Sequence, residues 1–379
     1  MSKKVKVLHF IYDLSIGGAQ AVVMNYLRLM KDDTEFDLTV AVCETSKKSE
    51  FDNEVKENKY PVDYLGYKKV NAPPVIRTIA NWFKYQWLIY KEIRRVKPDI
   101  IHSHLTHLLP YILFPAVVSG VKIRLHTMHS DPEAIEKRYV PWARCAFGLF
   151  GVMPVAVTES QAKKAKSIYG FKNCSVIGNG IDINRFNISE TKADIRQSFG
   201  IAEDCFVIGF VGRLHIVKNI GFLLEVFNEY KKNNPNAVLV IAGDGGEREK
   251  IRHMADAMGV SDSVKFLGMR KDIERIYKMI DVFMLTSFYE SSSIATVEAQ
   301  ISGARCVISD RIPKDVIISD KVNRLSLDAP RGDWIQAIDG KIKNDTIVNE
   351  PEFFGNKKTV NDLKDLYRSL LKKDKKKQR

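Results

Sequence analysis

The sequence predicts two doubly wound α/β domains, each with a parallel sheet covered by helices on both faces, and three observations indicate this. The chain has 379 residues, 45% of them hydrophobic, which suits about two domains with a core each. Short apolar segments alternate with amphipathic ones, as strands alternate with helices in such folds. The alternation occurs twice, on either side of a polar stretch near residues 180–200.

Each half of the chain contributes one series of elements. The expected strands are continuous apolar runs, which are typical of parallel strands buried on both faces. In the first half we expect strands at 5–12, 36–43, 99–103, 121–126 and 154–158, and helices that include 19–30 and 76–96. In the second half we expect strands at 206–211, 237–242, 264–267, 282–286 and 306–309, and helices at 220–232, 247–258, 273–280 and 294–302. Right-handed connections between such strands give parallel sheets.

A turn signal at Asn179-Gly180-Ile181-Asp182 marks the end of the first domain. We therefore place the domains at 1–185 and 186–355, with a separate segment at 356–379. A helix is predicted over 360–371, with one apolar face formed by Leu363, Leu366, Tyr367 and Leu370. The lysine-rich stretch that follows Leu371 is expected to be a solvated end.

The formal charge of +13 suggests a nucleic acid or an anionic membrane as a partner. The distribution of charge along the sequence disfavours nucleic acid as a partner. Residues 191–371 carry no net charge, and the two domains contain no basic stripe or motif for reading bases. The five cysteines include no CxxC pair, which disfavours a disulfide framework and a zinc site. No secretory segment follows Met1, and the apolar stretches 108–121 and 142–157 are too short to span a bilayer. We expect a cytoplasmic protein.

Ligands of open α/β sheets bind at the carboxyl ends of the strands, so the strand-to-helix junctions are the places to search. At the first junction, Gly17 and Gly18 let the backbone approach a ligand closely, and the helix start after them favours an anion. A tight turn without a ligand is the alternative. The absence of GxGxxG disfavours a nicotinamide enzyme.

Two cations, Arg213 and Lys218, flank the junction after the strand at 206–211. The guanidinium fork suits a diphosphate, and the ammonium adds a point charge beside a helix N-terminus. We interpret this as a diphosphate site, although an ordinary surface loop is the alternative.

Two carboxylates follow the strand at 282–286. Glu290 is expected in the loop after the strand, and Glu298 on a helix that begins near Ser293. One carboxylate could then bind a sugar and the other a ribose, with the diphosphate between them. The serine run at 291–293 caps the helix and offers backbone N–H groups to phosphate oxygens. An ordinary capped helix with one solvent-facing glutamate is the alternative.

Histidines are concentrated in the first half, at His102, His104, His107, His126 and His129. Their spacing is compatible with a metal, but few carboxylates accompany them. We interpret them as polar side chains that line strand ends, where an imidazole could still hold a sugar. No DxD tripeptide is present, so no divalent-ion site is predicted. The aromatic and basic segment 82–91 could lie on an anionic membrane, but we favour a helix packed in its own domain.

Taken in order, these residues resemble family 4 glycosyltransferases of the two-domain GT-B fold, and most of all the bacterial exopolysaccharide and capsule branch. The resemblance covers nearly the whole chain. It is carried by Gly17-Gly18-Ala19, Asp99-Ile100-Ile101-His102-Ser103-His104, His129, Asn179-Gly180-Ile181-Asp182 with Phe186, Gly212-Arg213-Leu214, Lys218-Asn219, Gly243-Asp244-Gly245, Phe266-Leu267-Gly268 and the pair Glu290 and Glu298.

The resemblance implies a role for each site residue. Arg213 and Lys218 would bind the donor diphosphate, together with the loop at Gly17 and Gly18. The catalytic residues would be His129 and Glu290, both facing the transferred sugar. The donor sugar would also meet the backbone at Ser292, Ser293 and Ile294, the ribose would meet Glu298, and the base would meet the backbone near Met269 and Arg270. The first domain would bind the acceptor, the second the nucleotide sugar, and the last helix would cross back to the first domain.

Three positions depart from the family pattern. Gln20 stands where the family commonly has Glu, which affects an acceptor-side contact. Ser291 stands where Gly is common, and Ser292-Ser293 replace Phe-Gly or Leu-Pro, which affects the sugar pocket. None of these changes removes an expected phosphate ligand.

The implied activity is that of a retaining, metal-independent glycosyltransferase without a cofactor. It would move a hexose or N-acetylhexosamine from a nucleoside-diphosphate sugar, UDP-linked by our expectation, to a glycan on a lipid carrier in exopolysaccharide or capsule synthesis. Peripheral contact with the inner face of the plasma membrane is expected, and nucleic acid is not. An epimerase or phosphorylase of the same fold, or a non-catalytic nucleotide-sugar-binding module, are the alternatives.

Overall fold

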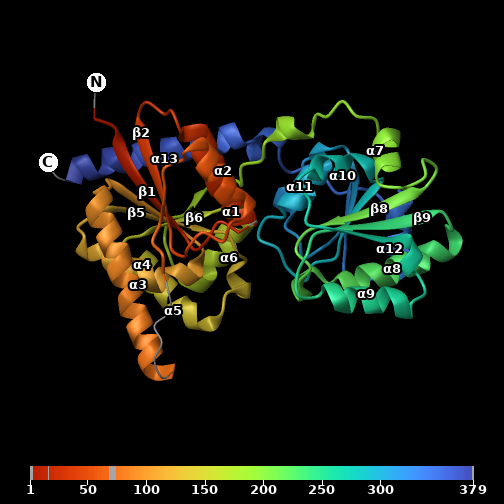
Figure 1. Ribbon diagram of the computed structural model, residues 1–379, viewed down its shortest axis with the longest axis horizontal. Coiled ribbons are helices and arrows are strands. Elements are labelled where there is room, and N and C mark those ends of the chain that lie inside the picture. The colour runs from red at the N-terminus through yellow and green to blue at the C-terminus, as the bar shows by residue number, and fades with distance from the viewer. Residues whose placement is uncertain (1–2, 16, 68–73, 378–379) are drawn as a thin grey trace. The chain divides into compact units, whose positions relative to one another are not determined.

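The computed structural model describes residues 3–15, 17–67 and 74–377, which form two compact units (Figure 1). Unit 1 comprises residues 1–180 and 356–379, and unit 2 comprises residues 181–355. The boundary lies between Gly180 and Ile181, a few residues before the position chosen from the sequence. The last helix belongs to the same unit as the first strand, although more than 300 residues separate them in the chain.

The described part of unit 1 contains a seven-stranded parallel sheet in the order β3-β2-β1-β4-β5-β6-β7. Its strands are β1 (Val5–Ile11), β2 (Phe36–Val42), β3 (Val62–Tyr64), β4 (Ile100–His104), β5 (Ile123–Met128), β6 (Met153–Ala156) and β7 (Ser175–Val176). Its helices are α1 (Gly18–Met30), α2 (Glu50–Asn58), α3 (Pro74–Val96), α4 (Leu109–Val118), α5 (Val140–Arg144), α6 (Glu159–Tyr169) and α13 (Asn356–Lys377).

Alternate residues of β1 contact different helices, as the pleat of a strand requires. Val7 and Ile11 belong to a core with apolar residues of α1 and α13. Leu8 and Phe10 belong to a second core with residues of α3 and α4. The helices therefore cover both faces of the sheet, and α13 lies on the same face as α1.

The described part of unit 2 contains a six-stranded parallel sheet in the order β10-β9-β8-β11-β12-β13, with one continuous core. Its strands are β8 (Phe206–Val211), β9 (Ala237–Ala242), β10 (Val264–Gly268), β11 (Val282–Leu285), β12 (Arg305–Ser309) and β13 (Val322–Leu325). Its helices are α7 (Lys192–Ser198), α8 (Ile220–Asn233), α9 (Arg248–Ala257), α10 (Ile273–Met279), α11 (Ile294–Ile301) and α12 (Arg331–Ile338). In both sheets the first strand of the unit lies in the interior.

The predicted fold class is confirmed, and the ten predicted strands are present with ends that differ by at most two residues. The missed strands β3, β7 and β13 have two to four residues each, too few to give a clear pattern. The stretch from Lys372 to Lys376 is largely exposed, as predicted, but it is helical, because α13 continues to Lys377. Lysine is a good helix former, so the helix extends past its last apolar residue.

Helix α3 buries one face in the core and exposes large apolar side chains on another. Tyr85 and Ile89 are buried in the core with the sheet, as the packed-helix interpretation requires. Phe83 and Trp87, one turn apart, are 61% and 59% exposed, so the side of the helix away from the core also carries large apolar side chains. Among the described residues, no helix combines the length and the apolar character needed to cross a bilayer.

Candidate functional site

The strongest candidate site in unit 2 lies where the loops after β8 and β11 meet. These two strands are hydrogen-bonded neighbours in the parallel sheet, so the loops after them leave the same edge. The N–H of Phe288 donates to the carbonyl of Val217 at 2.8 Å, and the Thr286 hydroxyl donates to the carbonyl of Asn219 at 2.9 Å. The loops are thus joined directly, which brings together two segments about 70 residues apart.

Within this junction the ammonium of Lys218 forms an ion pair with Oε1 of Glu290. The same oxygen accepts a hydrogen bond of 3.0 Å from the Ser287 hydroxyl. The side chains of Lys218 and Glu290 are 21% and 15% exposed, so the pair is largely but not completely removed from water. The contact confirms neither residue's role, but it places a predicted diphosphate ligand and a predicted sugar ligand side by side.

Arg213 is exposed and makes no hydrogen bond or ion pair with any residue that the structure describes. Its neighbour Gly212 lies close to Lys218, because a Cβ built at Gly212 would be 3.9 Å from Lys218 Cε. The guanidinium is therefore on the same loop as Lys218 but is not joined to it or to Glu290. Its charge is available to a ligand.

Glycine is required where the backbone loops at this edge approach each other. The N–H of Gly212 donates to the carbonyl of Ala242 at 3.0 Å. Gly243 has a φ of +137°, and a Cβ there would lie 1.9 Å from the carbonyl oxygen of Gly212. This contact excludes any side chain at Gly243. The same holds at Gly245, where a Cβ would lie 2.2 Å from the carbonyl oxygen of Leu214, so the loops after β8 and β9 can pack backbone to backbone only because the β9 loop has glycine at both positions.

Helix α11 starts as predicted, with the Ser293 side chain capping it by accepting a hydrogen bond from the N–H of Thr296. The hydroxyl oxygen of Ser292, directly before this cap, is buried and lacks a hydrogen-bond partner among the described residues. A buried hydroxyl without a hydrogen-bond partner lowers the stability of the fold, unless a bound ligand pairs with it. Ile294 is the first residue of the helix, so the three positions expected near the sugar lie at one helix N-terminus.

Glu298 lies on α11 and is partly buried, which excludes the solvent-facing alternative. The hydroxyl of the buried Tyr277 donates to its Oε2 at 3.0 Å. Burial raises the pKa of Glu298 to about 7, because few dipoles replace the lost water around its charge. Further hydroxyl donors, such as those of a ribose, would favour the ionised form.

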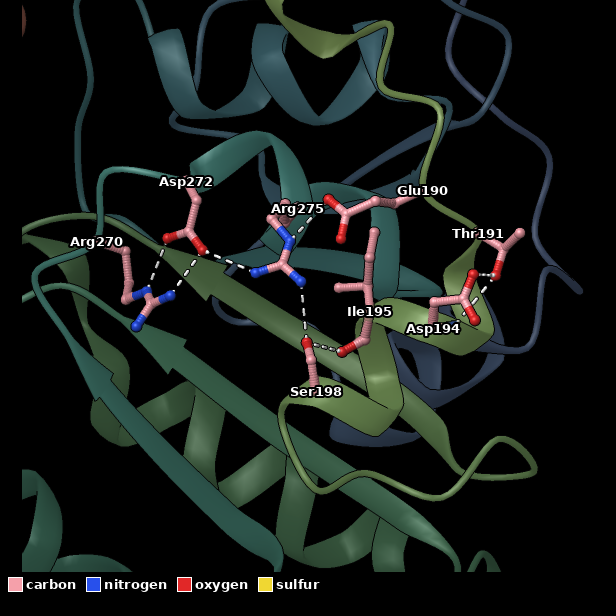
Figure 2. A network of polar contacts seen from close by, with 8 residues as sticks. All are labelled: Glu190, Thr191, Asp194, Ile195, Ser198, Arg270, Asp272 and Arg275. Carbon is pink, nitrogen blue, oxygen red and sulfur yellow. Dashed lines mark hydrogen bonds and ion pairs between the residues drawn. The ribbon is translucent and has the colours of Figure 1, made fainter.

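The two residues expected near the base differ in their surroundings. Met269 is 51% exposed. Arg270 forms a two-pronged ion pair with Asp272, at 2.8 and 2.6 Å (Figure 2). Its guanidinium also lies over the Phe199 ring. Asp272 also contacts Arg275, which reaches Ser198 and Glu190 and so links α10 to α7. The Arg270 side chain thus helps to hold the unit together, and its backbone remains the part expected to meet a base.

In unit 1 the predicted histidine follows β5 directly. His129 is partly buried, and its Nε2 lies 2.9 Å from Nδ1 of His104. His126 lies on the strand itself, where its Nδ1 is 2.9 Å from the Ser103 hydroxyl. Sequence reasoning missed His9 and Tyr367, which contact His104 and His102 respectively. The position of His9 between Val7 and Ile11 in β1 was the available signal, since alternate residues share a face.

The glycine pair begins α1, with Gly17 as the N-cap and Gly18 as the first helical residue. Gln20, the unusual residue after them, donates from Nε2 to Oδ1 of Asp13 at 3.1 Å. Asp13 also pairs with Lys47 at 2.6 Å. Gln20 therefore has a structural partner in its own unit, and the extended N-cap leaves the first N–H groups of α1 without a side-chain cap.

Comparison with known proteins gives a consistent family. Residues 16–185 match the family described as Glycosyltransferase Family 4, and residues 191–358 match Glycosyl transferases group 1. An Escherichia coli UDP-Gal:alpha-D-GlcNAc-diphosphoundecaprenol alpha-1,3-galactosyltransferase is 27% identical, over 97% of this chain and 98% of its own. The Staphylococcus aureus capsular polysaccharide biosynthesis glycosyltransferase CapH is 24% identical, over 96% and 99%.

A solved structure, Anabaena HepE in complex with UDP and glucose, has a TM-score of 0.77 and covers 97% of this chain and 99% of its own. Its sequence is 19% identical, so this likeness concerns the fold. The two-sheet architecture of the chain is therefore shared over its whole length.

Proposed function

Because this chain belongs to the family 4 glycosyltransferases with the GT-B fold, we propose that it transfers a hexose or N-acetylhexosamine from a UDP-sugar to a glycan acceptor. The proposed transfer retains the anomeric configuration and needs no metal ion. One observation carries the proposal. At the carboxyl edge of the unit 2 sheet, the guanidinium of Arg213 has no partner among the residues that the structure describes, and it lies on the same loop as the Lys218 ammonium, which is paired with Glu290.

Sugar transfer from a nucleoside-diphosphate donor needs positive charge near the diphosphate, because negative charge develops there as it leaves. In the proposed reaction the bond between the anomeric carbon and the diphosphate oxygen breaks. The acceptor oxygen bonds to that carbon on the same face, and its proton passes to the leaving phosphate. Arg213, Lys218 and the N-terminus of α11 stabilise the departing charge, and no covalent nucleophile is required.

The remaining residues orient the donor. Glu290 and the Ser292 hydroxyl, which lacks a partner among the described residues, bind sugar hydroxyls. The family resemblance assigns His129 to the donor sugar as well. Glu298 accepts from the ribose hydroxyls, and the backbone at Met269 and Arg270 meets the base. Lys218 shifts from Glu290 toward the phosphate when the donor binds, which releases the carboxylate to the sugar.

We infer a lipid-linked acceptor at the cytoplasmic face of the membrane, in exopolysaccharide or capsule synthesis. The name of the Escherichia coli relative includes a diphosphoundecaprenol-linked sugar, and CapH is named for capsular polysaccharide. The exposed apolar face of α3, with Phe83 and Trp87, is a suitable surface for peripheral contact.

The test is an assay of purified protein with a panel of UDP-sugars and a diphosphoundecaprenol-linked sugar, with and without EDTA. We expect UDP release that depends on acceptor, persists in EDTA and gives a product with the donor's anomeric configuration by NMR. A strict divalent-ion requirement contradicts the metal-free mechanism. Conversion of the donor without acceptor indicates an epimerase, and nucleotide binding without transfer indicates a binding module.

A further inference from the structure

A continuous chain of hydrogen-bonded side chains runs through the interior of unit 1. Strands β1, β4 and β5 contribute to it, together with the segment after β5 and the C-terminal helix α13. In order along the chain of contacts, its members are Thr127, His102, Tyr367, His9, His104 and His129. His9 and His102 are register partners of β1 and β4, which explains why the imidazoles lie so close.

Tyr367 is the junction of two arms. Its hydroxyl lies 2.8 Å from Nε2 of His9, whose Nδ1 lies 2.9 Å from Nε2 of His104. Nδ1 of His104 in turn lies 2.9 Å from Nε2 of His129. This arm connects the last helix of the protein to the histidine that we assign to the donor sugar.

The other arm is shorter. The Tyr367 hydroxyl lies 2.7 Å from Nδ1 of His102, and Nε2 of His102 lies 2.7 Å from the hydroxyl of Thr127. Thr127 is buried, and its hydroxyl has no other hydrogen bond to a residue that the structure describes.

Helix α13 is fixed in the position that the junction requires. Val360, Leu363 and Tyr367 are buried in the core that they share with α1. On the next turns, Lys364 pairs with Asp33 at 2.5 Å, and Arg368 pairs with Glu35 at 2.6 Å. Apolar packing and two ion pairs therefore hold Tyr367 over the strands.

The imidazoles of this chain are neutral, because burial lowers the pKa of His9 to about 3 and that of His129 to about 4. Burial also lowers the pKa values of His102 and His104 well below the ordinary value. A neutral imidazole has one N–H and one acceptor nitrogen. Each ring must therefore donate at one contact and accept at the other.

This constraint leaves two proton arrangements. If Tyr367 donates to His9, each ring of the long arm donates from Nδ1, and His129 accepts at Nε2. Thr127 then donates to His102, and His102 donates to Tyr367. If all directions are reversed, Thr127 accepts from His102, and its buried hydroxyl proton has no partner. The first arrangement pairs the protons of Thr127, His102, Tyr367, His9 and His104 along the chain and ends at the Nδ1–H of His129, a partly exposed residue. The second ends at a hydroxyl proton of the buried Thr127, so the first is favoured.

A metal ion is the competing interpretation, since one ring nitrogen from each of His9, His102 and His104 lies within 4.8 Å of the other two. Both ring nitrogens of each of these residues already have hydrogen-bond partners. The rings of His102 and His104 are also stacked, 4.6 Å apart with 21° between their planes. Imidazole lone pairs lie in the ring planes, so these two rings direct them into separate, nearly parallel layers.

We propose that Tyr367 is a positioning residue that sets the tautomer of His129 through His9 and His104, so that Nδ1 of His129 carries the proton and is a donor. The consequence for transfer rests on the proposed function, in which His129 contacts the donor sugar. A donor at Nδ1 suits an oxygen of a sugar or a phosphate. The last helix of the chain thereby orients a group at the edge of the first sheet.

The test is ¹⁵N NMR of full-length protein labelled at histidine, because protonated and unprotonated ring nitrogens have different shifts. Signals are assigned by single histidine substitutions. We expect His9, His102, His104 and His129 all to carry the proton on Nδ1, which free histidine disfavours. Protonation of His129 at Nε2 in the unmodified protein would overturn the proposal without any variant. Displacement of these protons by stoichiometric Zn²⁺ would overturn it in favour of a metal site.

The variant Tyr367→Phe then tests the dependence on the hydroxyl. We expect the Nδ1–H form of His129 to be lost in part, while His126, which pairs with Ser103, is unchanged. Tyr26→Phe is the matched control. Tyr26 is buried with its ring 5.6 Å from that of His9, and its hydroxyl bonds to none of the described residues. An unaltered His129 spectrum in Tyr367→Phe would overturn the proposal.

Kinetics separate this inference from the proposed function. We expect Tyr367→Phe to lower kcat about tenfold, as is typical of a group that acts through another, with UDP affinity changed less than twofold. Tyr26→Phe should leave kcat and UDP affinity within twofold of the values for the unmodified protein. If the spectra change as expected while transfer does not, the tautomer relay stands and the role of His129 in transfer is wrong. If transfer falls without a change in the His129 spectrum, the relay is wrong.

Discussion

Both units build a parallel sheet with their first strand in the interior, β1 between β2 and β4 and β8 between β9 and β11. The polar groups at the two sheets differ in kind. In unit 1 they are neutral imidazoles, buried and bonded to one another. In unit 2 they are charged side chains that keep some contact with water, and one of them, Arg213, is exposed and has no protein partner among the described residues. The same topology therefore supports a preorganised neutral network in one unit and a charged ligand site in the other.

The difference follows from what burial does to each type of group. A buried imidazole stays neutral and becomes part of a fixed hydrogen-bond network. A guanidinium cannot lose its proton, so it stays at the surface unless it is paired. We expect substitutions in unit 2 to change ligand affinity and turnover, and substitutions in the unit 1 network to change turnover alone.

The largest effect is expected for Arg213→Ala. Loss of the guanidinium should lower kcat/KM about 10²–10³-fold, because charge on the departing diphosphate is no longer stabilised. The melting temperature should not change, since Arg213 is exposed and makes no hydrogen bond or ion pair with a residue in the described part of the chain. Steady-state kinetics measures kcat/KM, and thermal unfolding measures the melting temperature. Lys250→Ala, which removes an exposed cation from α9, is the control. Turnover within twofold of the unmodified enzyme would contradict the assignment.

Glu290→Gln should lower kcat about 100-fold while UDP affinity changes less than about threefold, because the carboxylate contacts the sugar and UDP has none. Loss of the pair with Lys218 frees the ammonium for phosphate, which opposes any loss of affinity. Calorimetry with UDP and kinetics with the UDP-sugar separate the two effects. Glu249→Gln on the exposed surface of α9 serves as the control. Equal losses in both quantities would indicate a purely binding role.

A smaller effect is expected from pH. Burial sets the pKa of Glu298 at about 7, and ribose hydroxyls bind its ionised form, so affinity for a UDP-sugar should rise about tenfold from pH 6 to pH 8. A UDP-sugar is the ligand to use, because its diphosphate does not titrate in this range. Glu298→Gln should give a flat profile. Affinity that falls with pH in the unmodified protein would show that the protonated carboxyl binds the ligand.

The same raised pKa affects stability with a defined sign. Glu298 binds its proton more tightly in the folded state, so its contribution to stability is complete below pH 4.5 and is lost as the pH rises through about 7.

The smallest effect is expected at the exposed face of α3. Replacing Phe83 and Trp87 by serine should weaken partition onto anionic vesicles about fivefold, because two apolar side chains no longer enter the interface. Transfer to a water-soluble acceptor should be unchanged. Flotation with phosphatidylglycerol vesicles measures the partition, and Leu149→Ser, at an exposed apolar site elsewhere in unit 1, is the control. Equal partition of the variant would exclude this face as the membrane contact.

The unit 2 site was largely predictable because its parts obey local rules. Apolar runs such as Phe206–Val211 and Val282–Leu285 identify strands, and parallel strands place the loops that follow them at one sheet edge. That topology predicts that Lys218 and Glu290 lie near each other, and they form an ion pair. The serine cap of α11 is equally local, since Ser293 bonds within its own first turn.

The histidine network could not be predicted in the same way. His9 and Tyr367 are 358 residues apart, and their contact depends on the packing of α13 against the sheet, which no local pattern encodes. The amino-acid order alone fixed which segments are strands, which are helices, and which loops hold the charged candidates, because these depend on neighbours along the chain. Folding in three dimensions fixed the proton arrangement around His129 and the pKa of Glu298, because both depend on burial and on partners distant in sequence.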